Sequence, residues 1–278
     1  MFPILIGTSG YDHPELKGSF YPENLPRKDF LEYYSTQFNA LEINSTFYGM
    51  PTGERIINFY NRSQGRLKFS IKLNRLMTHE IDHQWQNQAE IFKKALTPLL
   101  EKSALASVLI QFPESFDYTT ENRQYLSALL KALYPLPCVV EFRHRNWIRS
   151  SVFEGLSARQ TGIVFCDMPQ CASPFQNSEQ LRTPFIGINA YIRMHGRNEN
   201  AWYAKNSPEE ETKRYDYEYS LEELVSFVPI IKTAQAEGRQ VQLYFNNHPK
   251  GIGFKNALQL MELLHIPKPR LNQEEFSF

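Results

Sequence analysis

Charged side chains interrupt the apolar runs of this sequence close to the points where those runs end. Carboxylates and histidine can transfer protons, and arginine can bind a phosphate or carboxylate through two parallel hydrogen bonds. Lysine supplies a point charge or, when desolvated, a nucleophile. These residue types point to chemistry on an anionic molecule, provided that the fold brings them together. The residues concerned are Glu42, Lys72, Glu141, Arg143, Asp167, Arg193 and His195.

Short β-rich runs alternate with longer helical patterns along the chain. Strands are predicted at residues 3–7, 40–44, 67–73, 106–112, 138–142, 162–166, 190–195 and 240–245. Helices are predicted at residues 27–38, 53–64, 88–102, 121–133, 147–160, 221–236 and 254–264. This order favours a parallel sheet with right-handed crossovers, and a chain of 278 residues suits an eight-stranded barrel. We expect an α/β fold, a closed parallel (β/α)8 TIM barrel forming a single domain over residues 1–278. The alternative is an open doubly wound sheet.

The alternation of side chains along each strand predicts which residues face the barrel axis. Because the helix layer is apolar, charged residues within a strand should point inward. The inward set is Glu42, Asn44, Lys68, Ser70, Lys72, Gln111, Glu141, Arg143, Tyr191, Arg193, His195, Tyr244 and Asn246. Most of these residues come late in their strands, so they should converge at the C-terminal mouth, where TIM barrels carry their active sites. The alternative is a structural ion-pair network that plugs the barrel.

Several strings at these strand ends resemble a known family. They are IGTSGY at 6–11, FNALEINSTFY at 38–48, FSIKLNRLMTH at 69–79, EFRHRNW at 141–147, YIRMHG at 191–196 and YFNNHPKGIGFKNAL at 244–258. Together they resemble the YecE-like family of TIM-barrel proteins, a domain of unknown function, from about residue 4 to residue 260. The resemblance implies the barrel fold but no established reaction. It also implies that one site contains Tyr11, Glu42, Asn44, Phe47, Tyr48, Lys72, Glu141, Arg143, Trp147, Arg193, His195, Tyr244 and Asn246.

Several chemistries compete at this mouth. A metal is disfavoured because three cations match the three carboxylates Glu42, Glu141 and Asp167 in number, so a metal ion would have to displace ion pairs. A glycosidase would need Glu42 and Glu141 close together, although their strands lie well apart around the ring. A Schiff base on Lys72 is conceivable, and a salt bridge to Glu42 or Glu141 is the competing interpretation.

The favoured hypothesis is an enzyme that acts on a phosphorylated or otherwise anionic small molecule or on a nucleotide. Its candidate catalytic residues are Glu141, His195, Lys72 and Asp167, with His195 as the acid or base oriented by Glu141 or Asp167. The candidate binding residues are Tyr11, Glu42, Asn44, Tyr48, Arg143, Trp147, Arg193, Tyr244, Asn246, Lys250, Gly251 and Gly253. The alternatives are a non-catalytic sensor and a metal-dependent, phosphodiesterase-like hydrolase. The sequence does not indicate a cofactor.

The segment after the eighth strand is a candidate anion site in its own right. Residues 246–254 read NNHPKGIGF and precede the last predicted helix, whose free N–H groups favour negative charge. Gly251 and Gly253 allow close backbone approach, and Lys250 adds a cation. Arg193 and Arg197 would close the other side. The alternative is an ordinary glycine-containing connection.

Composition limits the possible partners and the compartment. The 30 basic and 30 acidic residues balance, which argues against a broad electrostatic grip on duplex nucleic acid or an anionic membrane. The N-terminal apolar run is too short for a signal peptide, and no run approaches the roughly 20 apolar residues of a membrane span. The chain has 3 cysteines, and no pair of them has metal-ligand spacing. We expect a cytoplasmic protein with a small-molecule partner.

Overall fold

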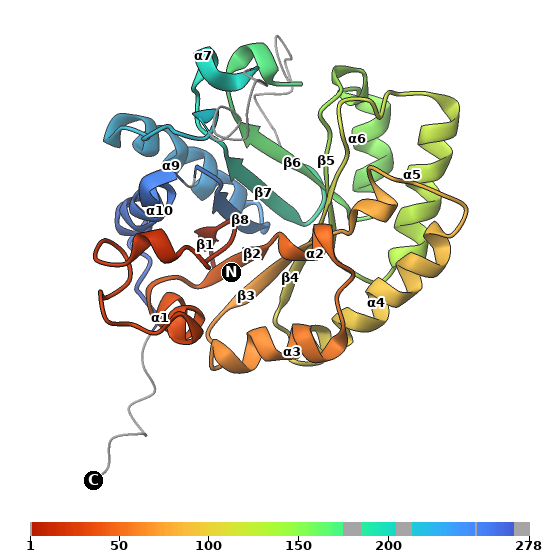
Figure 1. Cartoon of the computed structure of the whole chain (residues 1–278). Helices are drawn as coiled ribbons and strands as arrows, with labels where there is room; N and C mark the ends of the chain where they lie inside the picture. The colour runs from red at the N-terminus through yellow and green to blue at the C-terminus, as the bar shows by residue number, and fades with distance from the viewer. Residues whose placement is uncertain (1, 175–184, 204–212, 248, 270–278) are drawn as a thin grey trace.

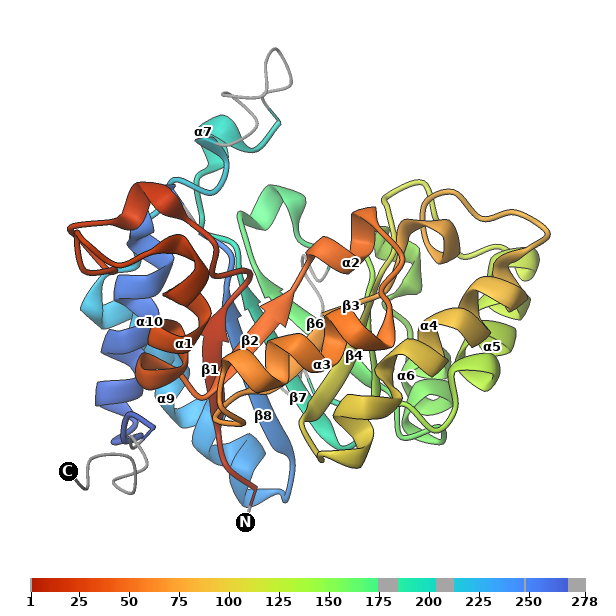
Figure 2. The same cartoon turned by 60° about the horizontal axis from the view of Figure 1, so that its bottom comes forward.

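Eight parallel strands form a nearly closed barrel with helices around it (Figures 1 and 2). The computed structural model describes residues 2–174, 185–203, 213–247 and 249–269. The strands follow the order β1-β8-β7-β6-β5-β4-β3-β2. Their bounds are β1 (Leu5–Thr8), β2 (Ala40–Ile43), β3 (Lys68–Lys72), β4 (Leu105–Gln111), β5 (Cys138–Glu141), β6 (Gly162–Asp167), β7 (Asn189–Met194) and β8 (Gln240–Phe245). This consecutive order fits a TIM-like barrel and excludes the doubly wound alternative.

The seam between β1 and β2 is where the expectation of a closed barrel needs correction. Among the described residues the only bridge across it joins Ser9 to Glu42, with the Gly10 N–H donating to the Glu42 carbonyl at 2.9 Å. Elsewhere a side chain stands between the strands. The Tyr34 hydroxyl accepts from the Thr8 N–H at 2.9 Å and donates to the Ala40 carbonyl at 3.0 Å. A regular backbone ladder is replaced here by side-chain hydrogen bonds.

Two separate apolar clusters show which way the strand residues point. One fills the barrel and contains the inward residues Leu109, Val139 and Val164. The other lies between strands and helices and contains residues predicted to face outward, such as Ile71 and Val140. Inside and outside therefore alternate along the strands as predicted, which sends the polar residues of alternate positions toward the axis.

The helices agree with most of the predicted ranges. Their bounds are α1 (Phe30–Gln37), α2 (Ser45–Tyr48), α3 (Gly53–Arg62), α4 (Trp85–Glu101), α5 (Thr120–Leu133), α6 (Ser150–Ser157), α7 (Glu199–Trp202), α9 (Leu221–Ala236) and α10 (Ile252–Leu263). Short 3-10 turns lie at Pro14–Leu16, Arg27–Asp29, Arg75–Met77, Arg145–Trp147, Gln170–Ala172 and Pro249–Gly251. In the described part of the chain, no helix is both long and apolar enough to cross a bilayer.

Two local differences from the predicted elements, and one agreement, matter for the site. The helix expected from residue 147 begins only at Ser150, because the preceding 3-10 turn buries the Trp147 indole. The short helix α2, which directly follows β2, was not predicted. The connection after β6 shows little helix in its described part, as expected, and residues 175–184 lie outside the described residues.

Candidate functional site at the barrel mouth

Arg193 ties together two buried carboxylates from opposite parts of the barrel. Its Nε and Nη2 donate to the two oxygens of Glu42 at 3.0 and 2.8 Å, and its Nη1 donates to Glu141 Oε2 at 2.8 Å. The two glutamates are fully buried, and Arg193 is 3% exposed. One guanidinium thus links β7 to both β2 and β5. The predicted convergence of Glu42, Glu141 and Arg193 is present.

Glu42 is surrounded by further donors. The Ser9 hydroxyl donates to Oε1 at 2.6 Å, and the Tyr191 hydroxyl donates to Oε2 at 2.7 Å. The Ser70 hydroxyl lies 2.7 Å from that of Tyr191 and extends the network to β3. Both carboxylate oxygens are thus used in two strong contacts each, which makes Glu42 an anchor for the charges above it rather than a proton carrier.

Glu141 carries a second arginine. Arg143 Nη2 lies 2.5 Å from Glu141 Oε1, and the Arg143 side chain is 20% exposed. Burial alone would raise the pKa of Glu141, but the charges of Arg143 and Arg193 outweigh it and hold the pKa far below its usual value. Glu141 therefore stays ionised at neutral pH and cannot act as a general acid there.

His195 lies above this network as a neutral imidazole. Burial, together with the charges of Arg193 and Arg143, lowers the pKa of His195 well below its usual value. Arg143 Nη2 lies 3.3 Å from His195 Nε2, and the Asn246 side-chain amide lies 2.9 Å from Nδ1. Arginine can only donate, so Nε2 is the acceptor and Nδ1 carries the proton. Asn246 must then present its carbonyl oxygen, since the two amide atoms are interchangeable in assignment.

Lys72 is close to the network but is not paired within it. Its Nζ lies 4.2 Å from the centroid of the Phe47 ring, and no ion pair or hydrogen bond joins the ammonium to another described residue. The expected salt bridge to Glu42 or Glu141 is absent from the described residues, because arginines already occupy those carboxylates. Burial first, and then the charge of Arg193, lower the pKa of Lys72 to about 8.

Asp167 does not join the mouth through its side chain. Arg197 donates to both its oxygens at 2.8 and 2.7 Å, and the Tyr219 hydroxyl donates at 2.8 Å. Asp167 is level with the outward-facing Met194 in the strand register. Its only described link to His195 is backbone, the His195 N–H donating to the Asp167 carbonyl at 2.9 Å. The expectation that this carboxylate orients the imidazole is wrong for this geometry.

Trp147 also lies away from the mouth. Its ring stacks between Phe116 and Phe142, with ring centroids 5.3 and 4.6 Å away, and its indole N–H donates to the Phe116 carbonyl at 2.7 Å. The indole is buried in the outer cluster between strands and helices. This position gives Trp147 a packing role. The contacts of Trp147 therefore do not match the expectation, implied by the family resemblance, that it belongs to the site.

The remaining predicted binding residues vary in position. Asn44 has a buried Oδ1 without a hydrogen-bond partner. Tyr48 is 73% exposed beside Phe47. Tyr244 is fully buried against Tyr191 inside the barrel, too deep to meet a ligand directly. Tyr11, three residues after the end of β1, is half-buried against Tyr34 and Phe59, near Arg62.

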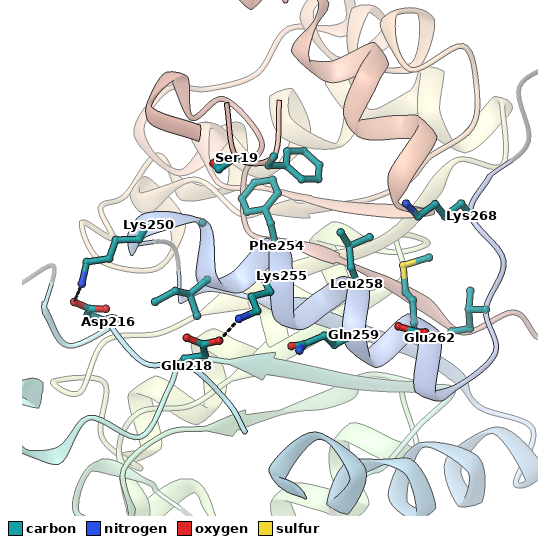
Figure 3. A pocket seen from close by; sticks show the side chains of 15 residues that line it. Ser19, Asp216, Glu218, Lys250, Phe254, Lys255, Leu258, Gln259, Glu262 and Lys268 are labelled. Carbon is teal, nitrogen blue, oxygen red and sulfur yellow. Dashed lines mark hydrogen bonds and ion pairs between the residues drawn. The ribbon is translucent and has the colours of Figure 1, made fainter. Parts of the chain in front are cut away.

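The Lys250 loop opens onto a different surface. Lys250 and Gly251 lie in the 3-10 turn just before α10 and Gly253 in its first turn, and the first two line a groove of about 1130 Å³ along the outer face of α10 (Figure 3). Lys250 forms an ion pair with Asp216 at 3.0 Å. The Gly253 N–H donates to the Asn247 carbonyl at 2.9 Å and is therefore not free for an anion. Arg193 lies inside the barrel, and Arg197 is occupied by Asp167 and Glu223.

The sequence analysis missed Cys166 as a neighbour of the charged network. Its thiol lies within 4.8 Å of donor atoms of Glu141 and His195. These donor types can bind a transition metal. Two guanidinium groups already contact Glu141, one of them also contacts His195, and burial raises the pKa of Cys166 so that it is a thiol. The trio therefore does not fit a resident cation. The alternation that placed Arg193 inside could have found Cys166, which is its partner in register.

Comparison with known proteins identifies the family of the chain. Residues 5–276 match the model of the family described as protein of unknown function DUF72. The UPF0759 protein YunF of Bacillus subtilis is 28% identical over 279 residues, which cover 95% of each chain. A crystal structure of a DUF72 family protein from Thermotoga maritima is 29% identical, with a TM-score of 0.79, and the match covers 95% of this chain and 100% of that one. One from Enterococcus faecalis, at 23% identity, supports the fold alone, with a TM-score of 0.80 over 98% of this chain and 99% of that one. The chain therefore belongs to the DUF72 family.

Proposed function

We propose that this protein is an enzyme that binds a small anionic molecule, a phosphorylated compound or a nucleotide, at the mouth of the barrel. The observation that carries the proposal is the surplus positive charge there. Among the described residues, Lys72, Arg143 and Arg193 face two carboxylates, those of Glu42 and Glu141. A ligand anion would supply the missing negative charge at Lys72 and at the partly exposed edge of Arg143.

His195 is the candidate proton carrier in this proposal. Its Nε2 lone pair accepts from Arg143, so the nitrogen becomes available as a base when a ligand draws Arg143 away. Glu141 holds Arg143 and Arg193 in position and takes no proton itself. The Phe47 ring lies against Lys72, Tyr48 packs edge-on to Phe47, and the two rings offer a surface on which a base or sugar could stack.

Two alternatives remain distinguishable. A non-catalytic sensor would bind the same anions without turnover. A metal-dependent, phosphodiesterase-like hydrolase would need a cation beside two guanidinium groups, which their charge opposes. Metal analysis of purified protein should show well under one equivalent of zinc or manganese, and a stoichiometric metal would favour the hydrolase. We also propose that the protein is YecE-like, which its strand-end motifs support. A cytoplasmic location is part of the same proposal and is supported by three cysteines that form no disulfide.

The test is binding of inorganic phosphate and adenosine monophosphate, measured by calorimetry and by the rise in Tm. Lys72→Met and Arg143→Met should each weaken binding by about 10- to 100-fold, the loss expected for one charged hydrogen bond. Lys68→Met is the matched control, because Lys68 lies at the other end of β3 and donates to the Ser103 carbonyl. Lys250→Met tests the α10 loop as the competing anion site.

The outcomes separate the possibilities. Absence of any phosphate- or nucleotide-dependent change in Tm contradicts the proposal, and so does binding that Lys72→Met leaves intact. If Lys250→Met is the one variant that loses binding, the anion site lies at the start of α10 and not at the barrel mouth. Binding by the wild type, with no change in a panel of phosphate esters followed by phosphorus NMR, favours the sensor.

A further inference from the structure

Lys72 differs from four other lysines in what its amine contacts. The amines of Lys93, Lys250 and Lys255 each lie within 3.0 Å of a carboxylate, and that of Lys68 donates to a carbonyl at 2.6 Å. Among the described residues, the amine of Lys72 lies over the face of an aromatic ring. The ring compensates a cation weakly, and no described group holds the amine by a hydrogen bond. This amine is free to react.

The surroundings of Lys72 are fixed by the backbone of α2. The Thr46 hydroxyl donates to the Lys72 carbonyl at 2.6 Å, and the Asn74 amide donates to the carbonyls of Thr46 and Phe47 at 2.8 and 3.2 Å. These bonds fasten α2 to the end of β3 and hold the Phe47 ring beside the amine. An aromatic wall set this firmly keeps water from the amine and favours its neutral form.

Burial and the neighbouring charges together lower the pKa of Lys72. Arg193 and Arg143 lower its pKa, and Glu141 and Glu42 raise it less than burial and the arginines lower it. His79, which packs edge-on to Phe47, and His195 also feel the Lys72 charge. With a pKa of about 8, roughly one tenth of the amine is neutral at pH 7 and half at pH 8. That fraction is enough for a nucleophile.

We propose that Lys72 forms an imine with the carbonyl carbon of an anionic aldehyde or ketone, while Arg143 binds the anionic group. This inference rests on the proposed function and narrows its substrate class to carbonyl compounds that carry a carboxylate or phosphate. The neutral Nζ attacks the carbonyl carbon, and one of its two protons moves to the carbonyl oxygen to give a carbinolamine. The second proton then goes to the hydroxyl, which leaves as water as the C=N bond forms. The step needs no oxidant or reductant.

His195 is the group placed to move the proton. It is neutral, and its Nε2 is released when the ligand anion takes over Arg143. The proton that Nζ gives up can pass to Nε2 and return to the departing hydroxyl. His195 and Lys72 both belong to the charged mouth, but Arg143 and Glu141 only bind and position.

The experiment is reductive trapping of the full-length protein with sodium cyanoborohydride. Glyoxylate supplies the carboxylate arm, glycolaldehyde phosphate the phosphate arm, and glycolaldehyde the uncharged control. Peptide mass spectrometry should find the reduced adduct, the aldehyde less one oxygen atom, on Lys72 more than about tenfold above Lys68 at pH 7.5, because burial lowers the pKa of Lys72 and the Lys68 amine is hydrogen-bonded to the Ser103 carbonyl. The trapping rate should rise with pH up to about 8.

Variants distinguish this inference from the proposed function. Lys72→Arg should abolish trapping at this position while losing much less phosphate affinity than Lys72→Met, because it keeps the charge but not the nucleophile. Arg143→Met should slow trapping of the two anionic aldehydes and leave trapping of glycolaldehyde nearly as fast. If the protein binds phosphate but Lys72 is not labelled selectively, the imine proposal is wrong and the proposed function stands. Equal labelling of Lys68 and Lys72 leads to the same conclusion. Loss of phosphate binding in the wild type overturns the proposed function instead.

Discussion

Arg193 directs all three guanidinium nitrogens at two buried carboxylates, so its charge is already compensated inside the barrel. The sequence suggested that this charge serves binding more than stability. Its contacts indicate that it holds the site together from below, while Lys72, Arg143 and His195 form the face that a ligand can meet. The structural ion-pair network and the functional site are thus two layers of one cluster.

Replacing Arg193 tests this division. Arg193→Met should lower the free energy of unfolding by about 3–5 kcal/mol at pH 7, because Glu42 and Glu141 would stay buried without a cation. Such a loss is tolerable for a protein with about 5–15 kcal/mol of stability, so the variant should still fold. Urea unfolding gives the difference, and Arg27→Met, on an exposed pair with Asp12, should change little.

The pH dependence of the same variant follows from the sign of the Glu141 shift. In the wild type the pKa of Glu141 is lower in the folded protein than the value of 4.5 expected in the unfolded chain. The ionised Glu141 therefore contributes to the free energy of unfolding above pH 4.5, and this contribution is lost only as the pH falls through the lower folded-state pKa. Without Arg193, burial pushes the pKa of Glu141 upward. The deficit of Arg193→Met relative to wild type should therefore shrink as pH falls from 7 to 5. A deficit that does not change with pH would contradict this explanation.

At the scale of elements, the barrel is joined at its seam by side chains. Tyr34 from α1 stands between β1 and β2 and satisfies a backbone group of each. The Asn39 side chain, just before β2, bonds only the β1 side, accepting from the Ile6 N–H at 2.8 Å and donating to the Ile4 carbonyl at 2.9 Å. A Cβ at Gly7 would lie 2.0 Å from the Ala40 oxygen, so only glycine allows this approach of the strands. The seam depends on a few specific residues rather than on a ladder.

The seam predicts a measurable weakness. Tyr34→Phe leaves the Thr8 N–H and the Ala40 carbonyl without their shared partner and should cost about 1–3 kcal/mol in the free energy of unfolding. Amide hydrogen exchange at Thr8 should quicken more than in the middle of β7. Tyr33→Phe is the matched control, because the Tyr33 ring packs against Phe20 and its hydroxyl makes no hydrogen bond among the described residues. Equal effects of the two variants would contradict the bridging role of Tyr34.

At the scale of the whole molecule, all eight strands belong to one barrel, and the charged cluster draws on β2, β5 and β7 at once. Apart from β1 and β2 at the seam, each strand is paired with a neighbour on both sides. We therefore expect the single domain predicted over residues 1–278 to lose its structure in one step. Urea unfolding followed by far-ultraviolet circular dichroism and by tryptophan fluorescence should give coincident curves. Two separated transitions would show that the chain contains two independently folding parts.

The sequence by itself determined the strands, most of the helices and the direction of the side chains along each strand. These are local properties, since alternation along a strand needs only the pleat of the backbone and an apolar helix layer. They placed Glu42, Lys72, Glu141, Arg193 and His195 at one mouth before any partner was known. The same alternation applied to β6 would have placed Cys166, the register partner of Arg193, inside the barrel and Asp167, the partner of Met194, outside.

The tertiary structure decided which charge meets which. Arg193 lies 151 residues from Glu42 and 52 from Glu141 in the chain, and their pairing depends on the tilt and register of strands across the barrel. The same geometry leaves Lys72 without a carboxylate partner among the described residues, because Arg193 contacts Glu42 and Glu141 and Arg143 contacts Glu141. It sends Asp167 to Arg197, and it closes the last seam through Tyr34. Pairing across the axis is a property of the assembled barrel, because each partner is supplied by a strand far away in the sequence.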